Sequence, residues 1–246
     1  MSGHSKWSTI KHKKGALDAK RGRIFTRLIK EITVAARIGG GNADGNPRLR
    51  AAVQEAKGQN MPADNIKKAI QRGTGELPGV TYEEKTYEAY GPGGAAILIQ
   101  AMTDNGNRTT SELRHMLSKH GGDLAVTNAV ARIFERKGYF VVAHGSVSED
   151  RLLEIILEAG GDDMRDDGEN YEIFTTPEAY EAVRKALETN QVPIAVAELS
   201  MIAQTEVHLE GKKAHQMLTL MESLEDHDDV QKVFSNFDID ASEIPE

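Results

Sequence analysis

The sequence lacks cysteine entirely, although it has 246 residues. This excludes disulfides, thiol nucleophiles, iron–sulfur clusters and the usual structural zinc sites. Aromatic residues make up only 5% of the chain, with a single tryptophan, Trp7. No apolar run approaches the roughly 18 residues that a membrane-spanning helix needs. The apolar content of 39% is still enough for a buried core. We therefore expect a soluble globular protein, and this length favours two or three domains.

The N-terminal stretch also has no apolar core of the kind found in secretory signals. The expected location is therefore the cytoplasm.

Positive charge is scarce overall but concentrated in one part of the chain. The net charge is -8, yet residues 1–76 hold 16 Lys or Arg against 6 Asp or Glu, and the remainder has a net charge of -18. Such an asymmetry indicates a polyanion partner for the basic part. The alternative is that the basic surface docks on the chain's own acidic surface.

The densest cationic stretch runs from residue 3 to residue 30 and contains one acid, Asp18. Its second half has helical periodicity, because Phe25, Leu28 and Ile32 recur on one face. At about 100° per residue, Lys20, Arg23, Arg27 and Lys30 fall on the opposite face. We predict that these cations form one solvent-facing ridge that meets successive phosphates. Trp7 either stacks on a base or anchors the segment to the core.

Residues 1–76 read as a small basic helical domain of three helices. Gly39 to Gly41 end the first helix, and Asn46-Pro47 is typical of an N-cap followed by proline at the first helical position. Gly58 ends the second helix. Met61-Pro62 precedes a third helix that ends near Gly73.

From Leu77 onward, strand-like and helix-like segments alternate. Segments 139–143, 149–159, 163–167, 170–175, 177–189 and 194–203 give the order β-α-β-β-α-β, which is ferredoxin-like. A strand is predicted around 82–90. Strands at 95–102, 130–135, 204–209 and 229–237, with helices at 107–120 and 211–225, predict a second unit of similar order. The predicted fold is α+β multidomain, a three-helix domain followed by two ferredoxin-like domains. The predicted domains are 1–76, 77–136 plus 204–246, and an inserted third domain at 137–203.

No catalytic or metal-binding motif emerges from the sequence. The histidines do not have metal-ligand spacing, and Asp163 to Phe174 lacks the carboxylate that a calcium loop requires at its last position. Tyr90-Gly91-Pro92-Gly93-Gly94 lacks the ending of a phosphate-binding loop and leads into a strand, so a tight turn is favoured. We expect neither an enzyme nor a metal or cofactor, and no membrane or small-molecule partner.

Several motifs resemble the YebC/PmpR family of probable transcriptional regulators, to which the mitochondrial translational activator of cytochrome c oxidase also belongs. The similarity is carried by Gly3-His4-Ser5-Lys6-Trp7, Asp18 to Gly22, Asn46 to Arg50, Tyr90 to Gly94, Thr103 to Thr109, Glu198 to Ile202 and Leu224 to Val230. The resemblance implies a three-domain protein, helical first and α+β thereafter, that binds DNA as a bacterial regulator. It also implies an association with the ribosome, where members resemble translation factors that relieve stalling.

The resulting hypothesis is a transcriptional regulator that binds DNA through its basic N-terminal domain. The predicted nucleic-acid-binding residues are Lys6, Trp7, Lys11, His12, Lys13, Lys14, Lys20, Arg21, Arg23, Arg27, Lys30, Arg48 and Arg50. Since the cations have few amide side chains beside them, backbone contacts are favoured over base readout. The alternative is a ribosome-associated translation factor that binds ribosomal RNA with the same cations.

Overall fold

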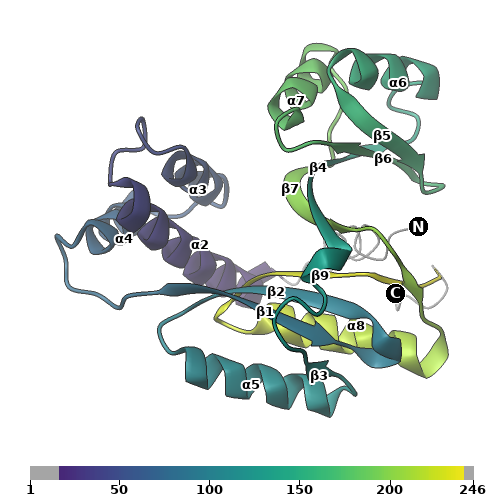
Figure 1. Ribbon diagram of the computed structural model, residues 1–246. Coiled ribbons are helices and arrows are strands. Elements are labelled where there is room, and N and C mark those ends of the chain that lie inside the picture. Colours follow the sequence, from purple (N-terminus) through teal and green to yellow (C-terminus); the bar gives the residue numbers. More distant parts are fainter. Residues whose placement is uncertain (1–16, 241–246) are drawn as a thin grey trace. The chain divides into compact units, whose positions relative to one another are not determined.

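The computed structural model describes residues 17–240, with side chains from Gly22 onward (Figure 1). Over this range the chain is α+β, with seven α-helices, two four-stranded antiparallel sheets and a two-stranded parallel pair. It folds as two compact units. The inserted unit is Arg132–Glu206, and the main unit comprises the described residues before and after it.

The main unit begins with three helices, α2 (Leu17–Gly39), α3 (Pro47–Gly58) and α4 (Ala63–Thr74). The predicted cap of α3 is confirmed, because the Asn46 side chain accepts a hydrogen bond from the N–H of Leu49 at 3.1 Å. The predicted apolar face of α2 is also confirmed. It packs against α3 and α4 in a core that contains Leu28, Ile32, Ala35, Ala36, Leu49, Ala52, Ala56, Met61, Ile66 and Ala69.

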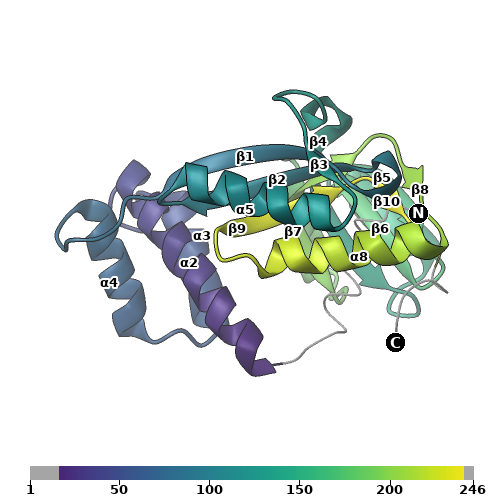
Figure 2. The same cartoon turned by 90° about the horizontal axis from the view of Figure 1, so that it is seen from below.

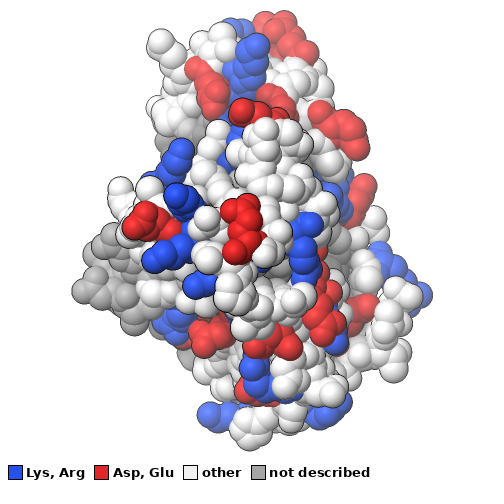
Figure 3. All heavy atoms as spheres, turned by 90° about the vertical axis from the view of Figure 1, so that its left-hand side faces the viewer, with Lys and Arg blue, Asp and Glu red and all other residues white. Residues whose placement is uncertain are grey.

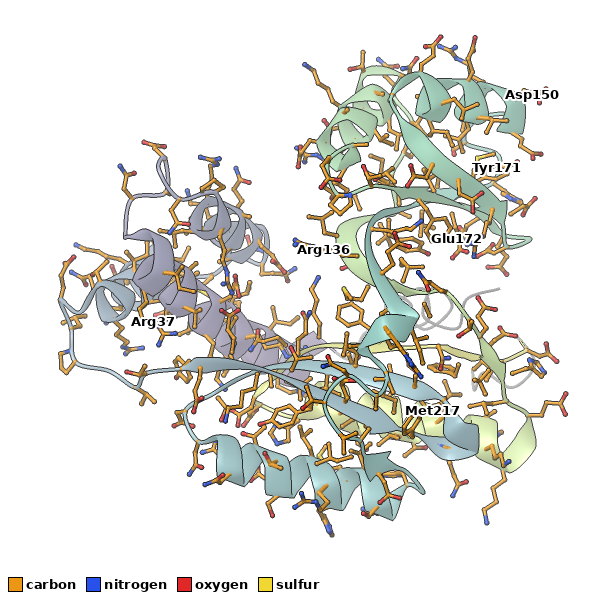
Figure 4. All side chains as sticks on the ribbon, in the orientation of Figure 1. Arg37, Arg136, Asp150, Tyr171, Glu172 and Met217 are labelled. Carbon is orange, nitrogen blue, oxygen red and sulfur yellow. The ribbon has the colours of Figure 1, made fainter. Side chains whose placement is uncertain are left out.

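A four-stranded sheet in the order β3-β1-β2-β9 forms the rest of the main unit. Its strands are β1 (Glu83–Tyr90), β2 (Ala96–Thr103), β3 (Asp123–Leu124) and β9 (Val230–Ser235). Helices α5 (Gly106–Lys119) and α8 (Gly211–Asp226) cover one face of it (Figures 1 and 2). Met217 of α8 is completely buried in this layer (Figure 4). A short parallel pair, β8 (Val207–His208) with β10 (Phe237–Asp238), follows the chain's return from the inserted unit.

The predicted tight turn at Tyr90 to Gly94 is confirmed. A 3-10 turn at Pro92–Gly94 joins β1 to β2, and Gly93 and Gly94 have φ of 72° and 82°. Glycine accommodates this left-handed conformation because it has no Cβ.

The inserted unit has the element order that the sequence predicts, β-α-β-β-α-β. Its elements are β4 (Phe134–Ala143), α6 (Glu149–Glu158), β5 (Gly161–Asp166), β6 (Asn170–Thr175), α7 (Tyr180–Thr189) and β7 (Val196–Ala203). The sheet order is β5-β6-β4-β7, with every neighbouring pair antiparallel. Tyr171 points toward the helices and Glu172 to the opposite side (Figure 4), where Glu172 accepts a hydrogen bond from Tyr139 at 2.7 Å.

The element order of the main sheet differs from the prediction. It is β-β-α-β-α-β, because β1 pairs with β2 along all eight residues as a hairpin. The strand predicted around 82–90 is confirmed as β1. The predicted order of the second unit instead used strands at 130–135 and 204–209. Neither is found as predicted. The return segment contains only the two-residue strand β8.

The predicted strand at 130–135 is wrong for an identifiable reason. The buried carboxylate of Glu88 accepts hydrogen bonds from the N–H groups of Asn128, Val130 and Ala131 at 2.6 to 2.9 Å. These bonds hold the chain in a bend around the carboxylate, and a 3-10 turn follows at Ala131–Ile133. Strand pairing begins only at Phe134, inside the inserted unit.

Asn105 is the N-cap of α5. The Asn105 side chain accepts a hydrogen bond from the N–H of Arg108 at 3.1 Å. None of the described helices is sufficiently long and apolar to span a bilayer.

Candidate nucleic-acid interface

The predicted site residues fall into two groups. Lys6, Trp7, Lys11, His12, Lys13 and Lys14 lie outside the described residues. Lys20 and Arg21 belong to the first turns of α2, but their side chains also lie outside the described part. The described members are Arg23, Arg27, Lys30, Arg48 and Arg50.

The prediction that Lys30 faces solvent is wrong. The residue is only 6% exposed, and its ammonium group donates to the carboxylate of Asp229 at 2.6 Å. It also donates to the carbonyl oxygen of Asp228 at 2.9 Å and to that of Met102 at 3.3 Å. These three acceptors take the place that phosphates would need. Lys30 is therefore a buried structural cation that joins α2 to the loop before β9.

Asp229, which is 3% exposed, is at the centre of this contact between α2 and the loop before β9, called the α2 joint below. Its second carboxylate oxygen accepts hydrogen bonds from Arg108 and from the Thr109 hydroxyl, both at 2.7 Å. Burial alone would raise the pKa of Asp229, but the hydrogen bonds from Lys30, Arg108 and Thr109 outweigh it and hold the pKa well below its usual range. The carboxylate therefore remains charged in the folded protein.

The other two described cations on this side of α2 also contact the segment at the end of α8. Arg23 forms an ion pair with Asp226 at 2.9 Å, and Arg27 donates to the carbonyl oxygen of Glu225. Burial lowers the pKa of Arg27. The described cations of the predicted ridge, from Arg23 to Lys30, therefore all contact segment 225–229 of the chain itself.

Arg48 does not extend an open cationic surface either. Its guanidinium forms a bidentate pair with Glu31 at 2.7 and 3.0 Å and contacts Glu84 at 2.7 Å. The hydrogen bonds to Glu31 and Glu84 raise its pKa above the ordinary value. Arg50, in contrast, is exposed and donates to the carbonyl oxygens of Ala43 and Asp44, both at 3.2 Å.

Other cations of the three-helix part, outside the predicted set, are exposed to solvent. They are Arg37, Lys57, Lys67, Lys68 and Arg72. The three-helix part lies on the left in Figure 1 and faces the viewer in Figure 3, where blue and red side chains are interspersed. The helical pattern of α4 could have identified three of them, because its inward positions Ile66, Ala69 and Ile70 leave Lys67, Lys68 and Arg72 outside.

One group in the described part has the composition of a metal site, namely Glu112, His227 and Asp229, whose ligand atoms lie within 4.8 Å of one another. Asp229 already neutralises Lys30 and Arg108 in this place. His227 in turn contacts Glu112 at 2.9 Å. Both carboxylate oxygens of Asp229 therefore already have a cationic partner from the protein itself.

Two family models match the chain. The model of the TACO1/YebC protein N-terminal domain matches residues 5–76, and that of the TACO1/YebC second and third domain matches residues 82–237.

Curated relatives match over nearly the full length. A probable transcriptional regulatory protein of Acidobacterium capsulatum is 60% identical over 243 residues, which cover 99% of this chain and 98% of that protein. A protein of the same description from Geobacter sulfurreducens is 57% identical, with the same coverage of 99% and 98%. The crystal structure of a conserved hypothetical protein from Aquifex aeolicus has a TM-score of 0.79 at 46% identity, and covers 92% of this chain and 94% of that one.

Proposed function

Because the chain belongs to the TACO1/YebC family, we propose that it is a transcriptional regulator that binds DNA through its basic N-terminal part. The observation that carries this proposal is the charge distribution. Residues 1–76 have a net charge of +10 in a chain whose total is -8. The names of the relatives support a regulatory role. A regulator of bacterial DNA acts in the cytoplasm, which is the location we propose.

We assign the phosphate contacts to the predicted cations other than Arg23, Arg27, Lys30 and Arg48. These are Lys6, Lys11, Lys13, Lys14, Lys20, Arg21 and Arg50, with Trp7 and His12 beside them. Arg23, Lys30 and Arg48 are left out, because each forms an ion pair with an acidic side chain. Arg27 is left out because it is partly buried where it donates to the carbonyl oxygen of Glu225, whereas Arg50 is exposed. We further propose a three-domain organisation, 1–76, 77–136 with 204–246, and 137–203.

The proposal predicts steeply salt-dependent binding of duplex DNA by the full-length chain. Each phosphate contact contributes a slope of about 0.9 in a plot of log K against log salt concentration. Replacing Lys6, Lys11, Lys13 and Lys14 by Gln should therefore lower the slope by up to about 3 to 4. Fluorescence anisotropy with a labelled duplex measures this slope. An unchanged slope in this variant would remove these four residues from the interface.

The second candidate is a ribosome-associated translation factor. The name of the matching family models includes TACO1, and the sequence resembles a family that contains a translational activator. The same cations are suited to ribosomal RNA, since phosphate contacts do not by themselves distinguish the two nucleic acids. Sedimentation through sucrose at physiological salt separates the candidates. Cosedimentation with ribosomes, together with weak DNA binding, favours the translation factor.

A further inference from the structure

The described three-helix part, residues 22–76, contains ten Lys or Arg and five Asp or Glu. Four of the ten cations, Arg23, Arg27, Lys30 and Arg48, are engaged as described above. The remaining six are exposed, and they lie on α3, on α4 and near the end of α2. The positive charge that this part presents to solvent therefore lies away from the α2 joint.

Helix α4 presents the densest group of these cations. Lys68 and Arg72 are four residues apart and share one face of the helix, with Lys67 next to them. All three are exposed, and none has an ion-pair or hydrogen-bond partner among the described residues. The inward face of α4 is held by Ile66 and Ala69, which are buried against α2. The orientation of the cations is thus fixed by the packing of the opposite face.

Arg37 brings a fourth cation to the same area. The last turns of α2 and α4 touch at Gly73, where an added Cβ would lie 2.4 Å from the carbonyl oxygen of Thr33 and 3.2 Å from the backbone nitrogen of Arg37. Figure 4 shows Arg37 beside α4. Its side chain is exposed and has no hydrogen bond to any described residue. Two rigid helices therefore present cations from adjoining positions.

We propose that this surface, Arg37, Lys67, Lys68 and Arg72, is a further part of the three-helix domain that contacts the phosphate backbone of duplex DNA. The inference rests on the proposed function and adds the exposed face of α4 to the contacts assigned above. Only one acidic residue, Asp64, lies on α4 itself, in the first turn. Cations on a fixed helix face meet phosphates without reading base edges, so the contact is independent of sequence.

The test compares two full-length variants with the same change in charge. The first is K67Q/K68Q/R72Q. The control is K119Q/K212Q/K213Q, which removes three exposed lysines of α5 and α8 in the same unit. The probe is a labelled DNA duplex of random sequence, titrated over a range of salt concentrations. The first variant should bind about 10- to 100-fold more weakly at about 0.15 M salt, with the slope lowered by about 2 to 3. The control should bind within about twofold of the wild type.

Asp64→Asn provides a complementary change, because it removes the only acid of α4. It should tighten DNA binding about two- to fivefold, since the local repulsion of phosphate is relieved. Thermal unfolding followed by circular dichroism verifies that all variants remain folded.

The results separate this inference from the proposed function. If the wild type binds DNA and the α4 variant binds equally well, or no worse than the control, the α4 surface is wrong and the proposed function stands. If the wild type does not bind DNA at all, the proposed function fails, and the DNA contact of α4 fails with it. Loss of affinity confined to the α4 variant supports the inference.

Discussion

At the scale of single residues, Asp229 holds together parts of the chain that are distant in sequence. It contacts Lys30, which is 199 residues away, and also Arg108 and Thr109. The residues around it, Thr103 to Thr109 and Leu224 to Val230, are among the motifs that carry the family resemblance. The structure gives these motifs a structural role, because Asp229 accepts hydrogen bonds from Lys30 of α2 and from Arg108 and Thr109.

Replacing Asp229 by Asn should destabilise the protein by about 3 to 5 kcal/mol, because it leaves the buried ammonium of Lys30 without its counter-charge. Asp226→Asn is the matched control. It breaks a half-exposed ion pair with Arg23, which contributes at most about 1 kcal/mol. Urea unfolding of both variants measures the difference. Equal midpoints for the two variants would show that the Asp229 joint does not stabilise the fold.

The same variant has a pH signature. The pKa of Asp229 is lowered in the folded protein, so its contribution to stability is fully present above the ordinary value of 3.8 and is lost as the pH falls below it. The stability gap between wild type and D229N should therefore be constant near neutral pH and shrink below about pH 4. A gap that stays constant below that pH contradicts the assigned ionisation.

The burial of individual side chains was the feature hardest to predict from the sequence. The 3.6-residue period correctly assigned Leu28 and Ile32 to the core and placed Lys30 on another face. A helical period distinguishes the faces of one helix, but it does not reveal which other segment covers a face. The partner of Lys30 lies in the loop before β9, so only the tertiary fold reveals that the cation is buried.

At the scale of elements, the packing of α2 on α4 depends on one glycine. An added Cβ at Gly73 would lie 2.4 Å from the carbonyl oxygen of Thr33 and 2.7 Å from the Cβ of Ala36. Both are backbone or backbone-proximal atoms, so the helices themselves would have to separate. Alanine is normally the better helix former, by about 1 kcal/mol, yet at this position the contact opposes it.

Gly73→Ala should therefore destabilise the protein by about 1 to 3 kcal/mol, the usual cost of overpacking. Gly58→Ala is the control, because Gly58 also lies in a helix and an added Cβ there meets nothing within 4 Å. It should leave stability unchanged or slightly increased. Urea unfolding of both variants measures the difference in their free energies of unfolding. If G73A is as stable as G58A, the close approach of α2 and α4 is wrong.

The elements of the inserted unit were predictable because each is short, local and bounded by turns. Strand β6 and helix α6, for example, begin at the residues that the pattern gives. The main sheet was harder, because its pairing joins strands on both sides of the insertion. Strand β2 pairs with β9, so that Ile97 faces Ser235 far along the chain. The bend around Glu88 is equally invisible to a pattern, since it depends on one carboxylate of β1.

At the scale of the whole molecule, the two units differ strongly in charge. Residues 132–206 contain 7 Lys or Arg and 16 Asp or Glu, a net charge of -9, so the rest of the chain has a net charge of +1. The inserted unit therefore accounts for the acidity of the protein. It also has its own core between the sheet and the two helices, with Phe140, Leu152, Ile156, Ile173 and Leu187.

We predict that residues 132–206 fold in isolation, because their sheet and core are complete without the main unit. The isolated unit should unfold cooperatively in a circular dichroism melt. Its midpoint should rise as salt is added at low ionic strength, since salt screens the repulsion among its carboxylates. The same fragment should not bind the DNA duplex. A fragment without a cooperative transition at any salt concentration would mean that the inserted unit depends on the main unit for its fold. DNA binding by the fragment would contradict the assignment of the polyanion contact to the basic part.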